Sequence, residues 1–156
     1  MDSASIDARL AALGIALPAA SAPVANYVPV VLHHGVATVS GQLPRNEHGL
    51  ITGKVGQDVG LEAGRHAARQ CGLAVLAQLR EALGGDLGRV RRCVQLTGFV
   101  NATPEFTDHP TVVNGASDLM VEVFGEAGRH ARAAVGAGSL PLGAAVEVAA
   151  TFAVDE

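Results

Sequence analysis

The stretch AVEVAATFAV at residues 145–154 carries the strongest structural signal in the sequence. Side chains of a β-strand point alternately to its two faces, and the large residues of this stretch keep to one of them. The other face carries alanines, a threonine and one charged residue, Glu147. We therefore predict a strand with one apolar face buried under helices; the buried side chains are Val146, Val148, Phe152 and Val154.

Two segments have the periodicity of helices that would cover this face. The first begins after a capping Asp58 and continues to about Leu83, before Gly84-Gly85. The second spans residues 110–124, with a proline in its first turn and Gly125 after its end. The apolar residues recur every three or four positions; they are Ala68, Cys71, Val75, Leu79 and Leu83, then Val112, Val113, Ala116, Leu119, Met120 and Val123.

Further strands are expected from β-branched and alternating runs on either side of these helices. They span residues 27–33, 36–43, 89–100 and 130–136, and the first two form a hairpin around His34-Gly35. Val90, Val94, Leu96 and Val100 are expected to share the buried face of the third. The order β-β-α-β-α-β-β predicts an α+β fold with a mixed sheet and two helices on one face. A short helix at 5–13 and a Pro/Ala linker at 17–24 precede it, so we divide the chain into residues 1–24 and a domain at 25–156.

Composition excludes several classes of function. The 156 residues are 49% hydrophobic and 17% charged, which fits one folded domain. A net charge of −4 and 3% aromatic residues disfavour nucleic-acid binding, and we interpret Arg89, Arg91 and Arg92 as a solvated edge. No apolar stretch is long enough for a membrane helix, and the first residues lack the basic start of a signal peptide. We expect a cytoplasmic protein without a membrane partner.

The sequence also shows no pattern typical of a metal site or of a covalent nucleophile. The cysteines, Cys71 and Cys93, form neither a disulfide framework nor a zinc pattern. The adjacent histidines at 33 and 34 fall at the hairpin turn, so no metal is expected there. Ser40 lacks partner residues typical of a serine nucleophile.

Arg132 and Glu147 are the most informative polar residues. Each stands among alanines on a predicted strand, so each could form the floor of a pocket on the uncovered face of the sheet. An arginine binds a carboxylate through two parallel charged hydrogen bonds, which predicts a small carboxylated ligand. A salt bridge between Arg132 and Glu147 across adjacent strands is the alternative. The uncovered face itself suggests a partner subunit.

Residues scattered over 25–154 together resemble the YjgF/RidA family, also called L-PSP endoribonuclease-like proteins. They are Tyr27, Ser40-Gly41-Gln42, Pro44, Asn114, Ala131-Arg132, Leu140-Pro141 and Val146-Glu147-Val148. The N-terminal helix and residues 124–130 resemble a longer subgroup of that family. The resemblance implies a chorismate-mutase-like fold and a homotrimer with pockets at its subunit interfaces.

Family members of the deaminase type hydrolyse reactive enamines and imines, such as 2-aminoacrylate, to 2-keto acids and ammonia without a cofactor. By resemblance, Arg132 would bind the substrate carboxylate and Glu147 would activate water. The residues that would shape the pocket are Tyr27, Ser40, Gly41 and Asn114. Two positions depart from the family: Ala134 replaces a frequent cysteine, which leaves water as the nucleophile, and Ala149 replaces a frequent acidic residue. Non-catalytic binding or sensing of a carboxylate is the alternative function, and ribonuclease activity is a third.

Overall fold

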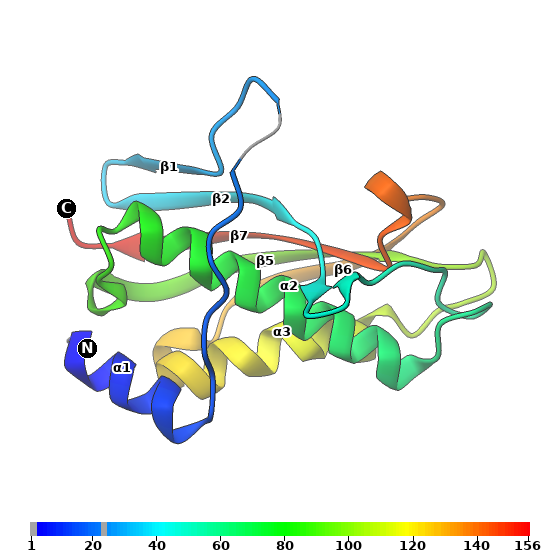
Figure 1. Cartoon of the computed structure of the whole chain (residues 1–156), viewed down its shortest axis with the longest axis horizontal. Coiled ribbons are helices and arrows are strands. Elements are labelled where there is room, and N and C mark those ends of the chain that lie inside the picture. Colours follow the sequence, from blue (N-terminus) through cyan, green and yellow to red (C-terminus); the bar gives the residue numbers. More distant parts are fainter. Residues whose placement is uncertain (1–2, 23–24) are drawn as a thin grey trace.

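The computed structural model describes residues 3–22 and 25–156. Five strands form one sheet in the order β1-β2-β7-β5-β6, and two long helices, α2 and α3, lie side by side across one face of it (Figure 1). The strands are β1 (Val30–His33), β2 (Val36–Gln42), β5 (Val90–Asn101), β6 (Ala131–Ala137) and β7 (Val146–Val154); the helices are α1 (Ser3–Ala12), α2 (Leu61–Ala82) and α3 (His109–Phe124). The predicted element order and fold class are confirmed.

The sheet is antiparallel except for the pair formed by β5 and the edge strand β6. Between β2 and α2, a small hairpin joins β3 (Arg45–Asn46) to β4 (Gly49–Leu50). Short 3-10 turns complete the connections: η1 (Leu87–Arg89), η2 (Gly125–Gly128) and η3 (Pro141–Gly143).

The core lies between the sheet and the two helices. Buried and partly exposed residues alternate along the whole of β7, as predicted, and Phe152 meets Phe124 of α3 with ring centroids 6.2 Å apart. The helices pack closely because glycine stands at their crossing: a Cβ atom on Gly115 would lie 2.0 Å from the backbone oxygen of Arg65. This close approach fixes where α3 presents its polar residues.

Two local predictions are wrong. Val94 was expected on the buried face of its strand, but it is 43% exposed, because irregularities in the pairing of β5 with β7 shift the register and turn Cys93 inward instead. Asp58 does not cap α2, because the N-cap residue is Gly60. The Asp58 carboxylate instead accepts a hydrogen bond from the backbone N–H of Lys54.

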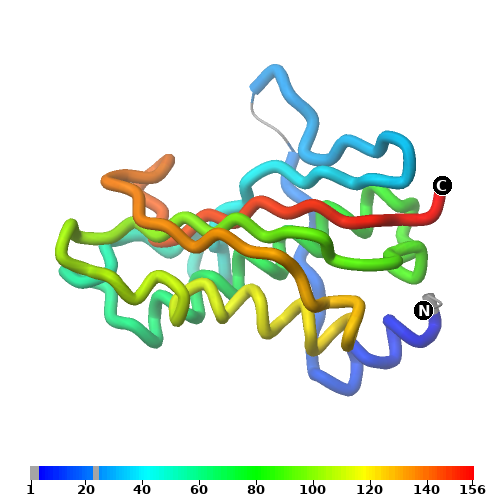
Figure 2. Tube along the Cα trace, turned by 180° about the vertical axis from the view of Figure 1, so that it is seen from behind, coloured from blue at the N-terminus to red at the C-terminus, as the bar shows by residue number. Residues whose placement is uncertain are grey.

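No helix of residues 3–22 or 25–156 covers the second face of the sheet, and the strands lie in front when the molecule is seen from behind (Figure 2). Small polar residues meet there, with Thr38 of β2 opposite Thr151 of β7. At the N-terminus, Ile6 and Leu10 of α1 join the main core. Residues 17–22 form no regular element, as expected for the linker, and its residues 23–24 lie outside the described part. Within the described ranges, no helix is long and apolar enough to cross a membrane.

Candidate functional site

Arg132 lies on the helix side of the sheet, not on the uncovered face where we expected it. It is in register with Leu96 of β5, whose side chain is fully buried beneath the helices. The prediction failed because β6 is an edge strand with alanines on both of its faces. The sequence therefore had no row of large side chains from which to decide which face was buried.

Two polar residues of α3 hold the guanidinium of Arg132. Its Nη1 donates to Oδ1 of Asn114 at 2.7 Å and to Oγ of Ser117 at 3.1 Å. The Ser117 hydroxyl also lies 2.8 Å from Nε2 of His130, and Nδ1 of His130 lies 2.6 Å from the Gly128 carbonyl oxygen. A carbonyl only accepts, so with a neutral imidazole Nδ1 donates to it and Nε2 accepts from Ser117. Each hydrogen bond in this series, from Arg132 through Ser117 and His130 to Gly128, then has one donor and one acceptor.

The remaining hydrogen-bond donors of Arg132 meet no acceptor among the described residues. Among the described residues, no carboxylate lies within ion-pair distance of this guanidinium, which is itself only partly exposed. A partly buried arginine without a counter-charge favours binding of an anion, and its planar geometry suits a carboxylate. We name the set of Arg132, Asn114, Ser117 and His130 the arginine group. Sequence reasoning missed Ser117, although its i+3 spacing from Asn114 places both on one face of a helix.

Glu147 projects from the uncovered face, as predicted, and its carboxylate lies against the backbone of Gly41. A Cβ atom on Gly41 would come within 2.5 Å of Oε2. Gly41 lies where the pairing of β2 with β7 shifts register, and this irregularity brings its backbone under the carboxylate. Burial raises the pKa of Glu147. Its carboxylate forms no ion pair or hydrogen bond within the described part of the chain.

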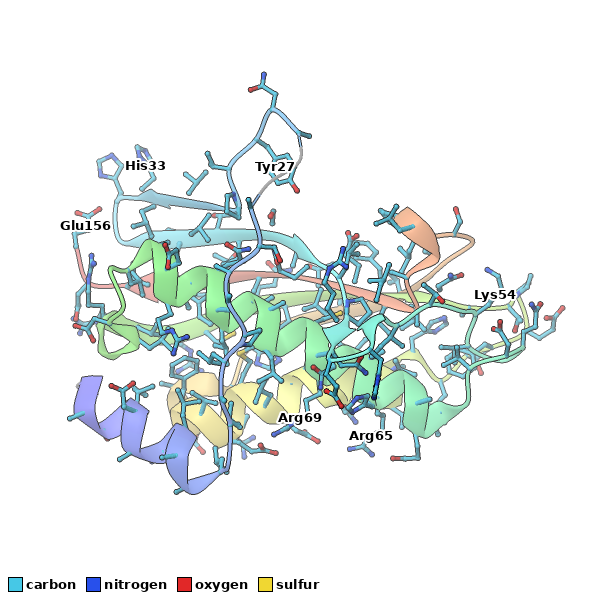
Figure 3. All side chains as sticks on the ribbon, in the orientation of Figure 1. Tyr27, His33, Lys54, Arg65, Arg69 and Glu156 are labelled. Atoms are coloured by element: carbon cyan, nitrogen blue, oxygen red, sulfur yellow. The ribbon has the colours of Figure 1, made fainter. Side chains whose placement is uncertain are left out.

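The predicted ligand residues Ser40 and Tyr27 lie on the Gly41 side of the molecule. Ser40 is next to Gly41, and its carbonyl oxygen accepts from the Gln42 side chain at 3.1 Å. Tyr27 and Gly41 line one pocket, and Tyr27 stands half exposed in the segment before β1 (Figure 3). We name Tyr27, Ser40, Gly41 and Glu147 the glycine group.

The arginine group and the glycine group do not meet within one chain. In the sheet, β5 separates β6 from β7, so the alternative of a salt bridge across adjacent strands is wrong. Strands are spaced about 4.8 Å apart, which places β6 roughly 10 Å from β7 and roughly 14 Å from β2. Arg132 and Glu147 also point to opposite faces. The six predicted site residues thus form two separate half-sites, and Asn114 is the one that contacts Arg132.

Other sequence candidates have ordinary structural roles. The Arg91 guanidinium pairs with Asp155 at 2.8 Å, while Arg89 and Arg92 donate to backbone carbonyls. The rings of His33 and His34 meet edge to face at the hairpin turn, 4.1 Å apart between centroids. No group of three or more potential metal ligands occurs in the described ranges.

Comparison with known proteins places this arrangement in a family. The profile of the family described as "YjgF/chorismate mutase-like, putative endoribonuclease" matches residues 7–153. The chain belongs to this family. The protein TCP17 of Trypanosoma cruzi is 53% identical over 148 residues, covering 94% of this chain and 92% of TCP17.

Solved structures of the same family share the fold over almost their whole length. A protein of unknown function from Agrobacterium tumefaciens is 47% identical, with a TM-score of 0.91, covering 98% of this chain and 94% of that one. A protein from Shewanella oneidensis called a "putative endoribonuclease" is 34% identical, also with a TM-score of 0.91, covering 96% and 99%.

Proposed function

We propose that the protein hydrolyses small imines and enamines that carry a carboxylate, in pockets formed between copies of the chain. One observation carries this proposal: Arg132 and Glu147 are both partly buried, neither has an oppositely charged partner in the described part of the chain, and they lie on opposite faces of one sheet. A second copy that brings its glycine group to the arginine group would complete both half-sites. The resemblance of this chain to the family, which implies a homotrimer with pockets at its subunit interfaces, supports the same arrangement.

The uncovered face of the sheet supports such an assembly. Its central strands present threonines and alanines, which allow another copy to approach closely, and Val135 at the β6 edge is 44% exposed. Small side chains surround the partly buried Glu147 on this face, which suits it to contact with another protein surface. We propose a homotrimer, as the family resemblance implies.

In this pocket the arginine group binds the substrate. The free N–H groups of Arg132 donate to the carboxylate next to the imine carbon, while Asn114 and Ser117 hold the guanidinium in place. Fixing the carboxylate positions the electrophilic carbon and supplies part of the rate acceleration through orientation. No cofactor is required, because an iminium carbon is already electrophilic.

Glu147 moves the protons. Its carboxylate accepts a proton from water as the water oxygen bonds to the carbon of the protonated imine, giving a tetrahedral carbinolamine. The same proton then passes to the amine nitrogen. As the C–N bond breaks, the carboxylate takes the hydroxyl proton, so that the 2-keto acid and ammonia form, and this last proton passes to the departing ammonia. Burial raises the pKa of Glu147, which brings the group closer to the range where one carboxyl can both accept and donate a proton.

The test couples a dehydratase that releases 2-aminoacrylate to the purified protein and follows 2-keto acid formation. Arg132→Ala should lower kcat/KM about a hundredfold, because two charged hydrogen bonds to the carboxylate are lost. Arg80→Ala removes an arginine outside both groups and should act as wild type. Equal rates for wild type and Arg132→Ala would refute hydrolysis at this site.

A mixing experiment tests whether the pocket lies between copies. Arg132→Ala and Glu147→Ala chains are each expected to be inactive, but when co-expressed some interfaces combine an intact arginine group with an intact glycine group. Partial recovery of activity supports the shared pocket, whereas no recovery in confirmed mixed oligomers contradicts it. If 2-keto acids stabilise the protein while imine decay is not accelerated, the pocket binds without turnover.

A further inference from the structure

The cavity that Tyr27 and Gly41 line, of about 270 Å³, lies between linker residues 18–22, helix α2 and the end of β2. We propose that it binds a small carboxylic acid that has an apolar body and an N–H or O–H donor. This inference goes beyond the proposed hydrolysis and does not depend on it. The residues that carry it are Gln78 within the cavity, Arg45 in its wall, and the alanines and prolines of the linker.

Gln78 supplies an unsatisfied acceptor inside the cavity. Only 4% of this residue is exposed, yet its side chain lines the cavity from α2. Its Nε2 donates to the carbonyl oxygen of Ser21 at 2.8 Å. Because a carbonyl can only accept, this bond fixes the orientation of the amide and leaves Oε1 as a separate acceptor. No described residue donates to Oε1, and it is not sealed from solvent, so a ligand N–H or O–H can reach it.

Arg45 supplies the charge for an acidic ligand. It lies on the small strand β3, is exposed, and forms no ion pair or hydrogen bond with the described residues. A guanidinium with all its donors free beside a cavity favours a carboxylate over a neutral group.

The remaining walls favour an apolar body between these two polar ends. Pro18, Ala19, Ala20 and Ala22 line the linker side, and Ala74 lines the α2 side. Gln70 and Gln78, eight residues apart on α2, extend the cavity along roughly 12 Å of that helix. The Gln78–Ser21 hydrogen bond fastens the linker over α2, and Figure 1 shows this segment crossing in front of the helix.

The cavity is separate from the arginine group and differs from the surface that carries Glu147. Its α2 wall places it on the helix side of the sheet, whereas Glu147 projects from the uncovered side. Gly41 lines the cavity, and its backbone also lies against the Glu147 carboxylate. A ligand here would therefore adjoin the glycine group without occupying the position of Glu147.

The chain contains a built-in reporter for this site. Tyr27 is its only tyrosine, tryptophan is absent, and Tyr27 lines the cavity. We would titrate the full-length protein with N-acetyl-L-leucine, which carries a carboxylate, one N–H donor and a branched apolar body but no ring that fluoresces. A saturable change in tyrosine emission is expected, and the methyl ester of the same compound should bind about fivefold to tenfold more weakly, since it lacks the charge for Arg45.

Variants separate this site from the catalytic one. Ala74→Leu fills the cavity and should abolish binding, and Arg45→Gln should weaken it about fivefold to tenfold. Two control variants should bind as wild type does. Arg80→Gln removes an arginine of α2 that lies outside the cavity, and Arg132→Ala removes the arginine of the arginine group. Circular dichroism would confirm that Ala74→Leu is folded.

Two results would overturn the proposal. The first is the absence of saturable binding by N-acetyl-L-leucine, and the second is wild-type affinity in Ala74→Leu. Loss of binding in Arg132→Ala would also overturn it, because the ligand would then belong to the arginine group. None of these results depends on imine hydrolysis, so a failure here leaves the proposed function to its own assay.

Discussion

Replacing Gly115 with alanine tests how the helix crossing positions the arginine group. A Cβ atom at this position would lie 2.0 Å from the backbone oxygen of Arg65 and 3.1 Å from the backbone nitrogen of Arg69. Backbone atoms cannot rotate away as side-chain atoms can, so α2 and α3 must separate. Because Asn114 precedes Gly115, that separation should also move the Asn114 amide away from Arg132.

The expected cost follows from two opposing effects. Overpacking a tightly packed core typically lowers the free energy of unfolding by 1–3 kcal/mol, and we expect about 3 kcal/mol where the clash is with backbone atoms. Alanine gains about 1 kcal/mol over glycine inside a helix. The net loss of about 2 kcal/mol should lower Tm by roughly 4–8 °C in a chain of this length.

Gly72→Ala is the matched control within α2. A Cβ atom there would meet the side-chain Cδ2 of Leu119 at 2.9 Å, and a leucine can shift its rotamer. The helix-propensity gain should offset that shift and leave Tm nearly unchanged. Thermal unfolding followed by circular dichroism at one protein concentration, together with kcat/KM, measures both effects. Wild-type stability of Gly115→Ala, or an equal loss in Gly72→Ala, would refute the reasoning from backbone contact.

Three further predictions concern single groups. Ser117→Ala should reduce kcat/KM about tenfold by removing one acceptor of Arg132, whereas Ser117→Thr, which keeps the hydroxyl, should restore it; equal activity of both variants would contradict this role. Burial raises the pKa of Glu147, so the folded chain keeps this proton to higher pH than the unfolded chain, and ionisation destabilises the fold as pH rises. In an Arg132→Ala background, Glu147→Gln should therefore leave Tm unchanged at acidic pH and raise it above the native pKa; a difference that does not vary with pH would rule this out. Burial raises the pKa of Cys93 to about 12 and raises that of Cys71, so neither thiol should react with a disulfide reagent in the native protein at neutral pH, and both should react in denaturant.

The sequence was sufficient where one row of large side chains defines a face. Along β7 and α3, the expected buried residues are buried, because burying them is what orders those elements. Family membership and the chorismate-mutase-like fold are also confirmed, since the family profile matches residues 7–153.

The sequence was insufficient where side chains are small or the strand pairing is irregular. The side of the sheet to which Arg132 points depends on the register of β6 beside β5. Because β6 carries alanines on both faces, its sequence does not indicate which face is buried. Val94 was misplaced because the irregular pairing of β5 changes its alternation part-way along the strand. Ser117 was missed because its role depends on the hydroxyl lying between Arg132 and His130, a contact between elements that no local pattern records.

The placement of the two groups limits what one chain can do. Arg132 can bind a carboxylate at the β6 edge, but the carboxylate of Glu147 lies two strands away on the other face, out of reach of the same small substrate. In the mechanism we propose, binding at Arg132 therefore needs one copy, whereas hydrolysis by these residues needs two. If both occur, dilution below the assembly concentration should abolish turnover while a 2-keto acid still binds the separated chains. Turnover by dilute, demonstrably monomeric protein would show that the reaction does not use Glu147 from a neighbouring copy.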